Sequence, residues 1–471
     1  MIKDYQDTKD YSNLNSDIDK IDEQVIKISR EFKDIAIRFL DNNSNNNVIF
    51  VTGGAGTGKS TLIKWLVKQA AKQKINISLC APTGTAARNI DGKTIHSFFC
   101  LDPNNTMIPS MFSPLSKKQK NRIRKYTHII IDEISMVRSD VLDAIDYRLK
   151  EAIPYKKNTP FAGVKLLLVG DAYQLPPIVT PPPGYEEIYK IAFNAELGGW
   201  KSGWFWDSKA YCEACPMVIN LTKNYRQQDD TNFANILNNL RICKDIKKNI
   251  ALINNRNTNS IPPPDCILLT LTNKAAEIEN NKKLAELDTP VETYTANLEG
   301  DFIIANNDRF NDIKNLKLKT GAKVISIVND TQGEYINGDL GIVQSLNPNY
   351  VTVEFSATGK VVDVYPNTWK SEILEIDSKT GELVKKCKGK FTQIPLMLGY
   401  AITIHKSQGM TLPNVYLYFG KKTAWEAGQI YVALSRVRNL KNLYMNRPLK
   451  EEDFYIDENL NEFIKKNISL L

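Results

Sequence analysis

The sequence predicts an α/β protein built from two parallel-sheet domains, with a small β-barrel inserted in the second. Apolar runs of about five residues, typical of strands buried on both faces, alternate with helical patterns between residues 48 and 171. The same alternation returns after residue 217. From about 326 to 394 the pattern changes to short strands separated by turn residues, which predicts the barrel.

Each predicted element rests on its own pattern. A helix is expected in 22–41, where apolar side chains recur every three or four residues. In the first set we expect helices at 60–72 and from 139, and strands at 48–52, 76–83, 128–133 and 164–171. In the second set we expect a helix at 232–244 and strands at 217–227, 266–273, 396–409 and 414–420. Tight turns are expected at Asn337-Gly338 and Thr358-Gly359, since glycine adopts the positive φ that such turns need.

Changes of pattern set the expected domain boundaries. An interruption of the first set begins with proline and serine and ends in a basic run, which indicates an insertion. The expected division is a frayed N-terminus (1–20), a first domain (21–216, with an insertion at 101–126), a second domain (217–325 and 395–445), the barrel (326–394) and a C-terminal tail (446–471).

Composition narrows the class of protein. The chain has 471 residues, of which 42% are hydrophobic, enough for more than one core. Its formal charge of +8 indicates a moderate preference for polyanionic partners such as nucleic acid. It has no apolar run of signal-peptide or membrane-span length, so we expect a cytoplasmic protein with no membrane partner. The Asn-, Ile- and Lys-rich composition is compatible with a bacterium or a phage-infected cell. Cys212 and Cys215 form a lone CxxC pair, which we interpret as thiols rather than as a zinc site.

The segment after the first strand carries a phosphate-binding pattern. Gly53, Gly58, Lys59 and Ser60 fit G-x-x-x-x-G-K-[ST] between a strand and a helix, which is the context that this motif requires. Backbone N–H groups can surround a phosphate at the helix N-terminus, Lys59 can reach the terminal phosphates, and Ser60 can ligate magnesium. The predicted nucleotide-binding residues of this loop are Gly53, Gly54, Ala55, Gly56, Thr57, Gly58, Lys59, Ser60 and Thr61.

Two carboxylates follow the strand IIIDE. Asp132 and Glu133 stand at its C-terminal end, the edge at which ligands bind in open α/β sheets. Asp132 is expected to hold the magnesium ion, and Glu133 to polarise the attacking water. Acidic residues at strand ends are common on their own. Together with the phosphate loop they predict hydrolysis of a nucleoside triphosphate.

Seven ordered motifs extend this prediction to a family. They are VTGGAGTGKST, APTGTAARNIDGKTIHSFF, IIIDEISMV, LLLVGDAYQLPPIV, LTKNYRQ, GYAITIHKSQGMTL and YVALSRVRNL. Their order resembles that of superfamily 1 helicases, and specifically the Pif/RecD-like branch (subgroup B), which includes the phage Dda helicases. The resemblance spans about residues 24 to 440. It implies two RecA-like P-loop domains with ATP and Mg²⁺ between them, single-stranded nucleic acid across their upper surface, a wedge at the 101–126 insertion, and an SH3-like barrel.

The resemblance assigns further residues to the ATP side. Gln174, in GDAYQLPP, would sense both the γ-phosphate and DNA, because an amide can donate and accept. Arg226 and Arg436 would meet the γ-phosphate across the cleft; without the family, either would be interpreted as a surface ion pair. Tyr225 would contact the nucleotide, and Gln24 would read adenine. The expected catalytic residues are Lys59, Asp132, Glu133, Gln174, Arg226 and Arg436, and the expected metal ligands are Ser60 and Asp132.

The resemblance also indicates residues for nucleic acid. Loops after strands can offer hydroxyls, amides and N–H groups to phosphates, and Phe98 and the histidines could stack on bases. Phe98 and Phe99 could instead be core residues. The candidates are Pro82, Thr83, His96, Phe98, Thr272, Asn273, Thr403, His405 and Lys406. The basic run at 117–126 is either a solvated helix face or a phosphate contact, and its position favours the second.

These assignments predict an ATP-dependent DNA helicase that translocates on single-stranded DNA and unwinds duplexes in replication, recombination or repair. Movement from 5′ to 3′ is implied by the resemblance to this branch alone. The expected partners are single-stranded DNA and its junctions with duplex. We expect a monomer that could work with replication or single-strand-binding proteins. The alternatives are an RNA-directed helicase, a translocase that does not separate strands, and a non-enzymatic P-loop module. The intact Asp132, Glu133, Arg226 and Arg436 disfavour the last.

Overall fold

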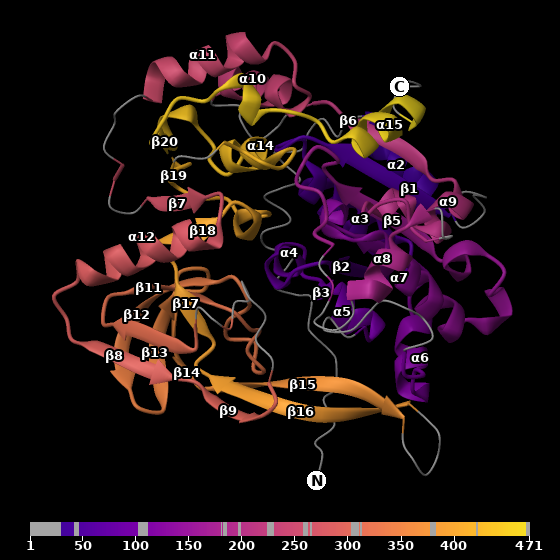
Figure 1. Ribbon diagram of the computed structural model, residues 1–471. Coiled ribbons are helices and arrows are strands. Elements are labelled where there is room, and N and C mark those ends of the chain that lie inside the picture. The colour runs from indigo at the N-terminus through magenta and orange to yellow at the C-terminus, as the bar shows by residue number, and fades with distance from the viewer. Residues whose placement is uncertain are drawn as a thin grey trace.

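The computed structural model describes residues 30–41, 47–101, 112–179, 181, 186–195, 199–223, 230–257, 262–263, 266–302, 310, 313–376, 383–420 and 423–467. These ranges form two parallel sheets and a group of antiparallel sheets, so the α/β prediction is confirmed. Figure 1 shows the first parallel sheet and its helices on one side, and the second above the antiparallel strands on the other. None of the helices in these ranges has the length and apolar character that a membrane crossing requires.

The first sheet contains six strands in the order β3-β2-β4-β5-β1-β6, all parallel. Along β1, Val48 and Phe50 face one core, whereas Ile49 and Val51 face the other. Both faces are covered, which explains why the longer strands of this sheet are mostly apolar in sequence. The strands are β1 (Val48–Gly53), β2 (Ile77–Ala81), β3 (Lys93–Thr94), β4 (His128–Ile131), β5 (Lys165–Gly170) and β6 (Met217–Leu221).

Helices cover both faces of this sheet. On one face, α2 buries Phe32, Ile35 and Phe39 in the same cluster as Leu62 and Leu66 of α3. On the other face, α5, α6 and α7 contribute to the second core. The helices are α2 (Arg30–Leu40), α3 (Lys59–Lys72), α4 (Gly84–Asn89), α5 (Ile95–Phe99), α6 (Lys117–Arg124), α7 (Ser139–Ala152), α8 (Glu186–Ala192) and α9 (Lys209–Ala214).

The prediction that the strand at 217 belongs to the second domain is wrong, because β6 is part of the first sheet. β6 pairs in parallel with β1, with Ile49 opposite Met217 and Gly53 opposite Leu221. Val218 and Leu221 are buried in the two cores of the first sheet. Alternation along the chain indicates a strand but not the sheet that it joins, so only the pairing reveals this edge strand.

The second parallel sheet has the order β18-β7-β19-β20. Asn280 connects a helix to this sheet, because its side-chain amide donates to the Ala401 carbonyl (2.9 Å) and accepts from the N–H groups of Tyr400 and Ala401. The strands are β7 (Ile267–Thr270), β18 (Ala401–Thr403), β19 (Val415–Tyr418) and β20 (Leu443–Met445). The helices are α10 (Thr231–Arg241), α11 (Ile246–Asn257), α12 (Asn273–Ala285) and α14 (Gln429–Leu434).

The β-rich insertion is longer than the expected range. Leu316 and Leu318 of β10 lie in one core with Val343 and Val353, although β10 precedes residue 326. Lysines alternate with leucines in β10, which obscured this strand in the sequence. The strands are β8 (Val291–Thr295), β9 (Asn297–Gly300), β10 (Asn315–Lys319), β11 (Lys323–Ser326), β12 (Leu340–Asn347), β13 (Tyr350–Phe355), β14 (Lys360–Val364), β15 (Asn367–Ile376), β16 (Leu383–Gln393) and β17 (Leu396–Leu398).

These strands form three antiparallel sheets. The largest has the order β14-β13-β12-β11-β17, and the others are β10-β8 and β15-β16-β9. The turn expected at Thr358-Gly359 joins β13 to β14, with a φ of 66° at Gly359. The turn at Asn337-Gly338 also forms, with a φ of 96° at Gly338, but within the longer loop between β11 and β12.

The C-terminal segment, expected to be a tail, returns to the first domain and packs there. The Phe463 ring of α15 (Glu458–Asn467) stacks on Trp206 at a centroid distance of 4.4 Å. The Trp204 indole N–H donates to Asp457 at 3.1 Å. Leu460 and Phe463, three residues apart on the helix, are both buried in the first core. The end of the chain therefore connects the second parallel-sheet domain to the first.

The basic run at 117–126 is largely engaged within the first domain. Arg122 donates to the Phe98 carbonyl at 2.7 Å, and Arg124 donates to the Ala152 carbonyl at 2.5 Å. Ile123 between them is fully buried, and Lys120 lies 3.4 Å from Glu151. Arg122 and Arg124 thus bind backbone carbonyls of their own domain, and a phosphate contact by this run stays a prediction.

Candidate nucleotide and nucleic-acid sites

The glycine-rich loop joins the end of β1 to the start of α3. Gly53 ends the strand, and Lys59 is the first residue of the helix. Gly56 and Gly58 have φ of 81° and 85°, a region that favours glycine. The Thr57 hydroxyl donates to the Gly54 carbonyl at 2.9 Å and closes the loop. The loop thus presents the first N–H groups of α3, the usual arrangement for binding a phosphate.

Lys59 lies inside this loop. Its Nζ donates to the carbonyls of Gly53 (2.7 Å) and Gly54 (2.9 Å). Burial lowers the pKa of Lys59, and the nearby carboxylates of Asp171 and Glu133 act in the opposite direction. Ser60 and Thr61, on the first turn of α3, are exposed. The lysine therefore lies at the loop centre, and the hydroxyl groups lie at its open side.

Asp132 and Glu133 follow β4, as the sequence indicated. Burial, and then the adjacent Glu133 carboxylate, raise the pKa of Asp132 to about 7. Glu133 Oε2 is buried and has no hydrogen-bond partner among the described residues. A buried carboxyl group and a half-buried neighbour with one buried, unpaired oxygen fit a divalent cation. No three His, Cys, Asp or Glu side chains of the described residues form a metal site by themselves. A magnesium ion here would therefore share its coordination with nucleotide phosphates.

The raised pKa of Asp132 leads to a prediction about stability. The folded state holds this proton more tightly than the unfolded chain, so the free energy of unfolding falls as pH rises from about 4 to about 7. Asp132→Asn imitates the neutral carboxyl group. With divalent cations chelated, we expect the variant to melt a few degrees above the wild type at pH 8, and the difference to shrink at pH 5. Thermal unfolding followed by circular dichroism measures both.

Asp34→Asn is the matched control for this prediction, because Asp34 is exposed on α2. Its melting temperature should follow that of the wild type at both pH values. If Asp132→Asn melted at or below the wild-type temperature at pH 8, the pKa of Asp132 would not be raised in the folded state.

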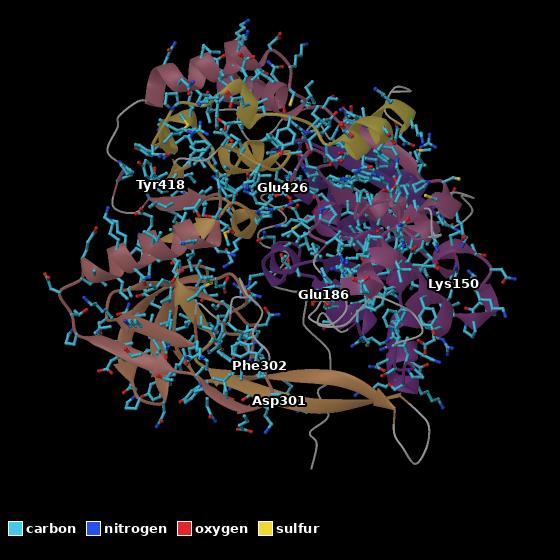
Figure 2. All side chains as sticks on the ribbon, in the orientation of Figure 1. Lys150, Glu186, Asp301, Phe302, Tyr418 and Glu426 are labelled. Atoms are coloured by element: carbon cyan, nitrogen blue, oxygen red, sulfur yellow. The ribbon has the colours of Figure 1, made fainter. Side chains whose placement is uncertain are left out.

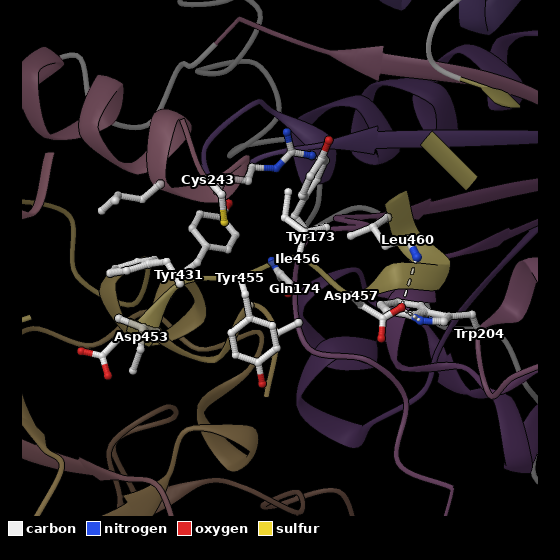
Figure 3. A pocket seen from close by; sticks show the side chains of 16 residues that line it. Tyr173, Gln174, Trp204, Cys243, Tyr431, Asp453, Tyr455, Ile456, Asp457 and Leu460 are labelled. Atoms are coloured by element: carbon white, nitrogen blue, oxygen red, sulfur yellow. Dashed lines mark hydrogen bonds between the residues drawn. The ribbon is translucent and has the colours of Figure 1, made fainter. Parts of the chain in front are cut away.

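Gln174 is nearly buried and faces the second domain. Its Oε1 accepts a hydrogen bond of 3.0 Å from Gln408 Nε2. Its backbone N–H donates to the Asp171 carbonyl at 3.1 Å, which fixes the tight loop after β5. Figure 3 shows Tyr173 and Gln174 of this loop together with Tyr431 around one cavity between the domains.

Arg436 is buried within its own domain. Its guanidinium donates to the carbonyls of Val432, Ser407 and Met410 at 2.8 to 3.2 Å. It therefore holds the loop that carries His405 and Gln408, and its contact with a γ-phosphate stays a prediction. Gln24, Tyr225 and Arg226 lie outside the described residues.

Three residues that sequence reasoning did not assign meet at the phosphate loop. The Tyr431 hydroxyl donates to Asp171 at 2.8 Å and accepts from the Ala55 N–H at 2.9 Å. Arg241 Nε donates to the other Asp171 oxygen at 2.8 Å. Asp171 and Tyr431 stand in the quoted motifs GDAYQLPP and YVALSR, which was the available signal. Arg241 ends an ordinary amphipathic helix, so nothing in the sequence marked it.

A cleft of about 490 Å³ separates the first domain from the second domain and the β-rich insertion. His405 lies there 2.6 Å from Glu426 and stacks on Trp425, and Figure 2 labels Glu426 between the two parallel-sheet domains. The predicted residues that line the cleft are Pro82, Thr83, His96, His405 and Lys406. Sequence reasoning missed the lining residues Gly84, Thr94, Met136, Ile325, Ser326, Ile327, Asn329, Asn337, Gly338, Met397, Gln408 and Met410.

The other nucleic-acid candidates lie elsewhere. Phe98 is 1% exposed and packs against Phe99 and Tyr126, so base stacking by Phe98 is wrong and the core interpretation holds. It is buried because α5 turns its apolar face toward the core. Thr272 caps α12, Asn273 begins that helix, and Thr403 accepts from the Lys406 N–H at 3.4 Å. These three are not lining residues of the cleft.

Comparisons with known proteins agree with this geometry. The PIF1-like helicase family model matches residues 27–251, and a model described as Helicase matches 394–469. The ATP-dependent DNA helicase Pif1 of Campylobacter jejuni subsp. jejuni is 31% identical over 449 residues, which cover 89% of this chain and 94% of that protein.

Solved structures of a Bacteroides relative extend the comparison to the fold. Pif1 bound to single-stranded DNA is 30% identical, with a TM-score of 0.80 over 94% of this chain and 98% of that one. The complex of that helicase with ADP-AlF3 and single-stranded DNA is 31% identical, with a TM-score of 0.79 over the same shares. These matches confirm the two RecA-like domains that the motifs implied. The chain belongs to the PIF1-like helicase family.

Proposed function

We propose that this chain is an ATP-dependent DNA helicase that translocates on single-stranded DNA and unwinds duplex DNA. The observation that carries the proposal is one short loop, residues 171–174, which contacts both sites. Asp171 accepts from Tyr431, which is itself bonded to the phosphate loop at Ala55. Gln174 accepts from Gln408, which lines the cleft. A displacement at the phosphate loop can therefore reach the cleft through a few direct contacts.

In the ATP site, the described residues divide the work of hydrolysis. The loop N–H groups and Lys59 would bind the phosphates, and Glu133 would accept a proton from the attacking water. Ser60 and Asp132 would hold Mg²⁺, which supplies charge neutralisation on the phosphates when bound. Gln174 would report the terminal phosphate to the cleft, since its amide can donate on one side while it accepts from Gln408 on the other.

The cleft offers groups suited to a single strand. Thr83 caps α4, whose N-terminal N–H groups can meet a backbone phosphate, and Lys406 adds positive charge. Asn329 and Asn337 supply amides from the β-rich insertion. Arg88 of α4 pairs with Asp339 of that insertion at 2.6 Å, so the walls of the cleft are joined at one side. This ion pair across one side of the cleft would help to retain a strand through successive cycles.

The proposal includes movement from 5′ to 3′, work as a monomer, and action at junctions of single-stranded and duplex DNA in the cytoplasm of a bacterium or a phage-infected cell. Replication, recombination and repair are the settings that such an activity serves, and single-strand-binding proteins are the expected partners. The seven ordered motifs support the polarity, because the family branch that they resemble has this direction.

Polarity is tested with two partial duplexes of equal length, one with a 5′ single-stranded tail and one with a 3′ tail. We expect ATP-dependent strand separation of the 5′-tailed substrate, and at most about a tenth of that rate on the other. Unwinding only of the 3′-tailed duplex would refute the direction. ATPase stimulated by DNA without separation of either duplex would instead favour a translocase without a working wedge.

Single-stranded RNA is the alternative nucleic-acid substrate. The same ATPase assay with single-stranded RNA of the same sequence distinguishes the two substrates. We expect DNA to stimulate hydrolysis more strongly, and equal or stronger stimulation by RNA would contradict the assignment to DNA. If the chain hydrolysed no ATP in the presence of either DNA or RNA, it would be a nucleotide-binding module rather than a motor.

A further inference from the structure

Arg241 of the second domain forms a buried ion pair with Asp171 of the first domain. Its Nε donates to Asp171 Oδ1 at 2.8 Å, and the side chains are 9% and 0% exposed. The guanidinium carbon lies 4.4 Å from the centre of the Tyr173 ring. Asp171 also accepts from the Tyr431 hydroxyl and from the Tyr173 N–H. The carboxylate is thus shared among several donors, and Arg241 holds only part of it.

Arg241 also lies against the phosphate loop. A Cβ placed on Gly54 would be 3.3 Å from Arg241 Cδ and 3.5 Å from the Tyr431 hydroxyl. The next residue of the loop, Ala55, donates its N–H to that hydroxyl. The last turn of α10 therefore packs directly on the loop that would surround the phosphates, and a side chain at Gly54 would separate them.

One donor of Arg241 is unused. Its Nη2 is buried and has no hydrogen-bond partner among the described residues. A buried guanidinium nitrogen without an acceptor is costly, whereas phosphate oxygens are the acceptors that an arginine fork matches best. A purely structural ion pair with Asp171 explains the position of Nε, but it gives Nη2 no partner.

We propose that Arg241 is a further nucleotide-binding residue, which contacts the terminal phosphate of a nucleoside triphosphate from the second domain while Asp171 keeps its guanidinium oriented. This rests on the proposed function, because it requires the glycine-rich loop to bind a triphosphate. The contact makes closure of the domains sensitive to the third phosphate. Arg241 would thus be a further cation at the phosphates, in addition to the lysine and arginines that the motifs assign. It lies on α10, which contains none of the seven motifs.

The test compares a triphosphate with a diphosphate. Isothermal titration calorimetry with the β,γ-imido analogue of ATP and with ADP, both with Mg²⁺, gives two dissociation constants for each full-length protein. We expect Arg241→Ala to weaken binding of the analogue by about 10- to 100-fold, the range for loss of a hydrogen bond from a charged group, and to leave ADP binding within about twofold. Arg241→Gln, which keeps a donor for Asp171, should show the same selectivity with a smaller disturbance of folding.

Arg138→Ala is the matched control. Arg138 also pairs with a buried aspartate, Asp140, at 2.7 Å, and it also lies over a tyrosine ring, Tyr189, at 5.5 Å. Its loss removes a similar ion pair from the first domain but no contact with the phosphate loop, so both nucleotides should bind this variant as they bind the wild type.

The outcomes separate this inference from the proposed function. A wild type that binds neither nucleotide would overturn both. A wild type that binds both, with variants that lose analogue and ADP affinity equally or lose neither, would overturn the role of Arg241 alone. Folding of each variant is checked by thermal unfolding, and Arg241→Gln decides the question if Arg241→Ala does not fold.

Discussion

Replacing Lys59 with alanine is expected to abolish ATP hydrolysis while DNA binding is largely retained. Lys59 Nζ lies at the centre of the glycine-rich loop, bonded to the carbonyls of Gly53 and Gly54. Removing a preorganised cation from developing phosphate charge costs at least about 100-fold in turnover. The cleft proposed for DNA is lined by other residues, and Lys59 is not one of them. A coupled ATPase assay with saturating single-stranded DNA measures the first effect, and fluorescence anisotropy of labelled DNA measures the second.

Lys64→Ala is the control for this variant, because Lys64 lies on the same helix with its side chain exposed. It removes an equal charge without touching the loop, so its turnover should match the wild type. Hydrolysis by Lys59→Ala at more than about a tenth of the wild-type rate would rule out this loop as the ATP site.

Gly428→Ala is expected to push apart the two parallel-sheet domains where α14 meets the 171–174 loop. Gly428 has a φ of 72°, and a Cβ there would lie 2.5 Å from the Tyr173 carbonyl oxygen and 3.0 Å from that of Gln174. Both oxygens belong to backbone, which cannot move aside as a flexible side chain does. The methyl group therefore displaces α14, and with it Tyr431, from the 171–174 loop. We expect DNA-stimulated turnover to fall at least about tenfold, the factor for ~1.4 kcal/mol of closure energy.

Gly420→Ala is the control that distinguishes the effect of this clash from the effect of backbone strain. Gly420 also has a positive φ, 61°, but among the described residues no atom outside its chain neighbours lies within 4 Å of its added Cβ. Both variants carry the strain of a left-handed alanine, whereas only Gly428→Ala meets the other domain. Small-angle X-ray scattering should report a more open molecule for Gly428→Ala alone. Equal turnover in the two variants would show that contact at Gly428 is not needed for the ATPase cycle.

Most strands of the first sheet were predictable because their signal is local. Each of the longer strands is a mostly apolar run that ends where the chain must leave the sheet, whereas the two-residue strand β3 carries no such signal. β6 shows the limit of this argument. Its residues identify a strand, but partner choice depends on β1, which lies more than 160 residues earlier in the sequence. The same limit applies to α15, whose apolar stripe predicts a packed helix but not the domain on which it packs.

Phe98 shows how a motif can mislead. It stands among candidates for the nucleic-acid surface, yet the short helix α5 directs it into the core, while His96 two residues earlier lines the cleft. In a helix of five residues, sequence spacing alone does not indicate whether His96 or Phe98 faces outward. Burial of one requires exposure of the other, and the sheet on which α5 packs makes that choice.

By itself, the sequence determined the α/β class, the glycine-rich loop, the paired carboxylates and the family, because each depends on residues that are neighbours in the chain. Tertiary structure alone decided that β6 joins the first sheet, that the C-terminal helix returns to the first domain, and that Arg241 and Tyr431 meet Asp171 beside the phosphate loop. Such contacts join residues far apart in the chain, such as Ala55 and Tyr431, which are 376 positions apart. They follow from how whole domains pack, and no local pattern of side chains encodes them.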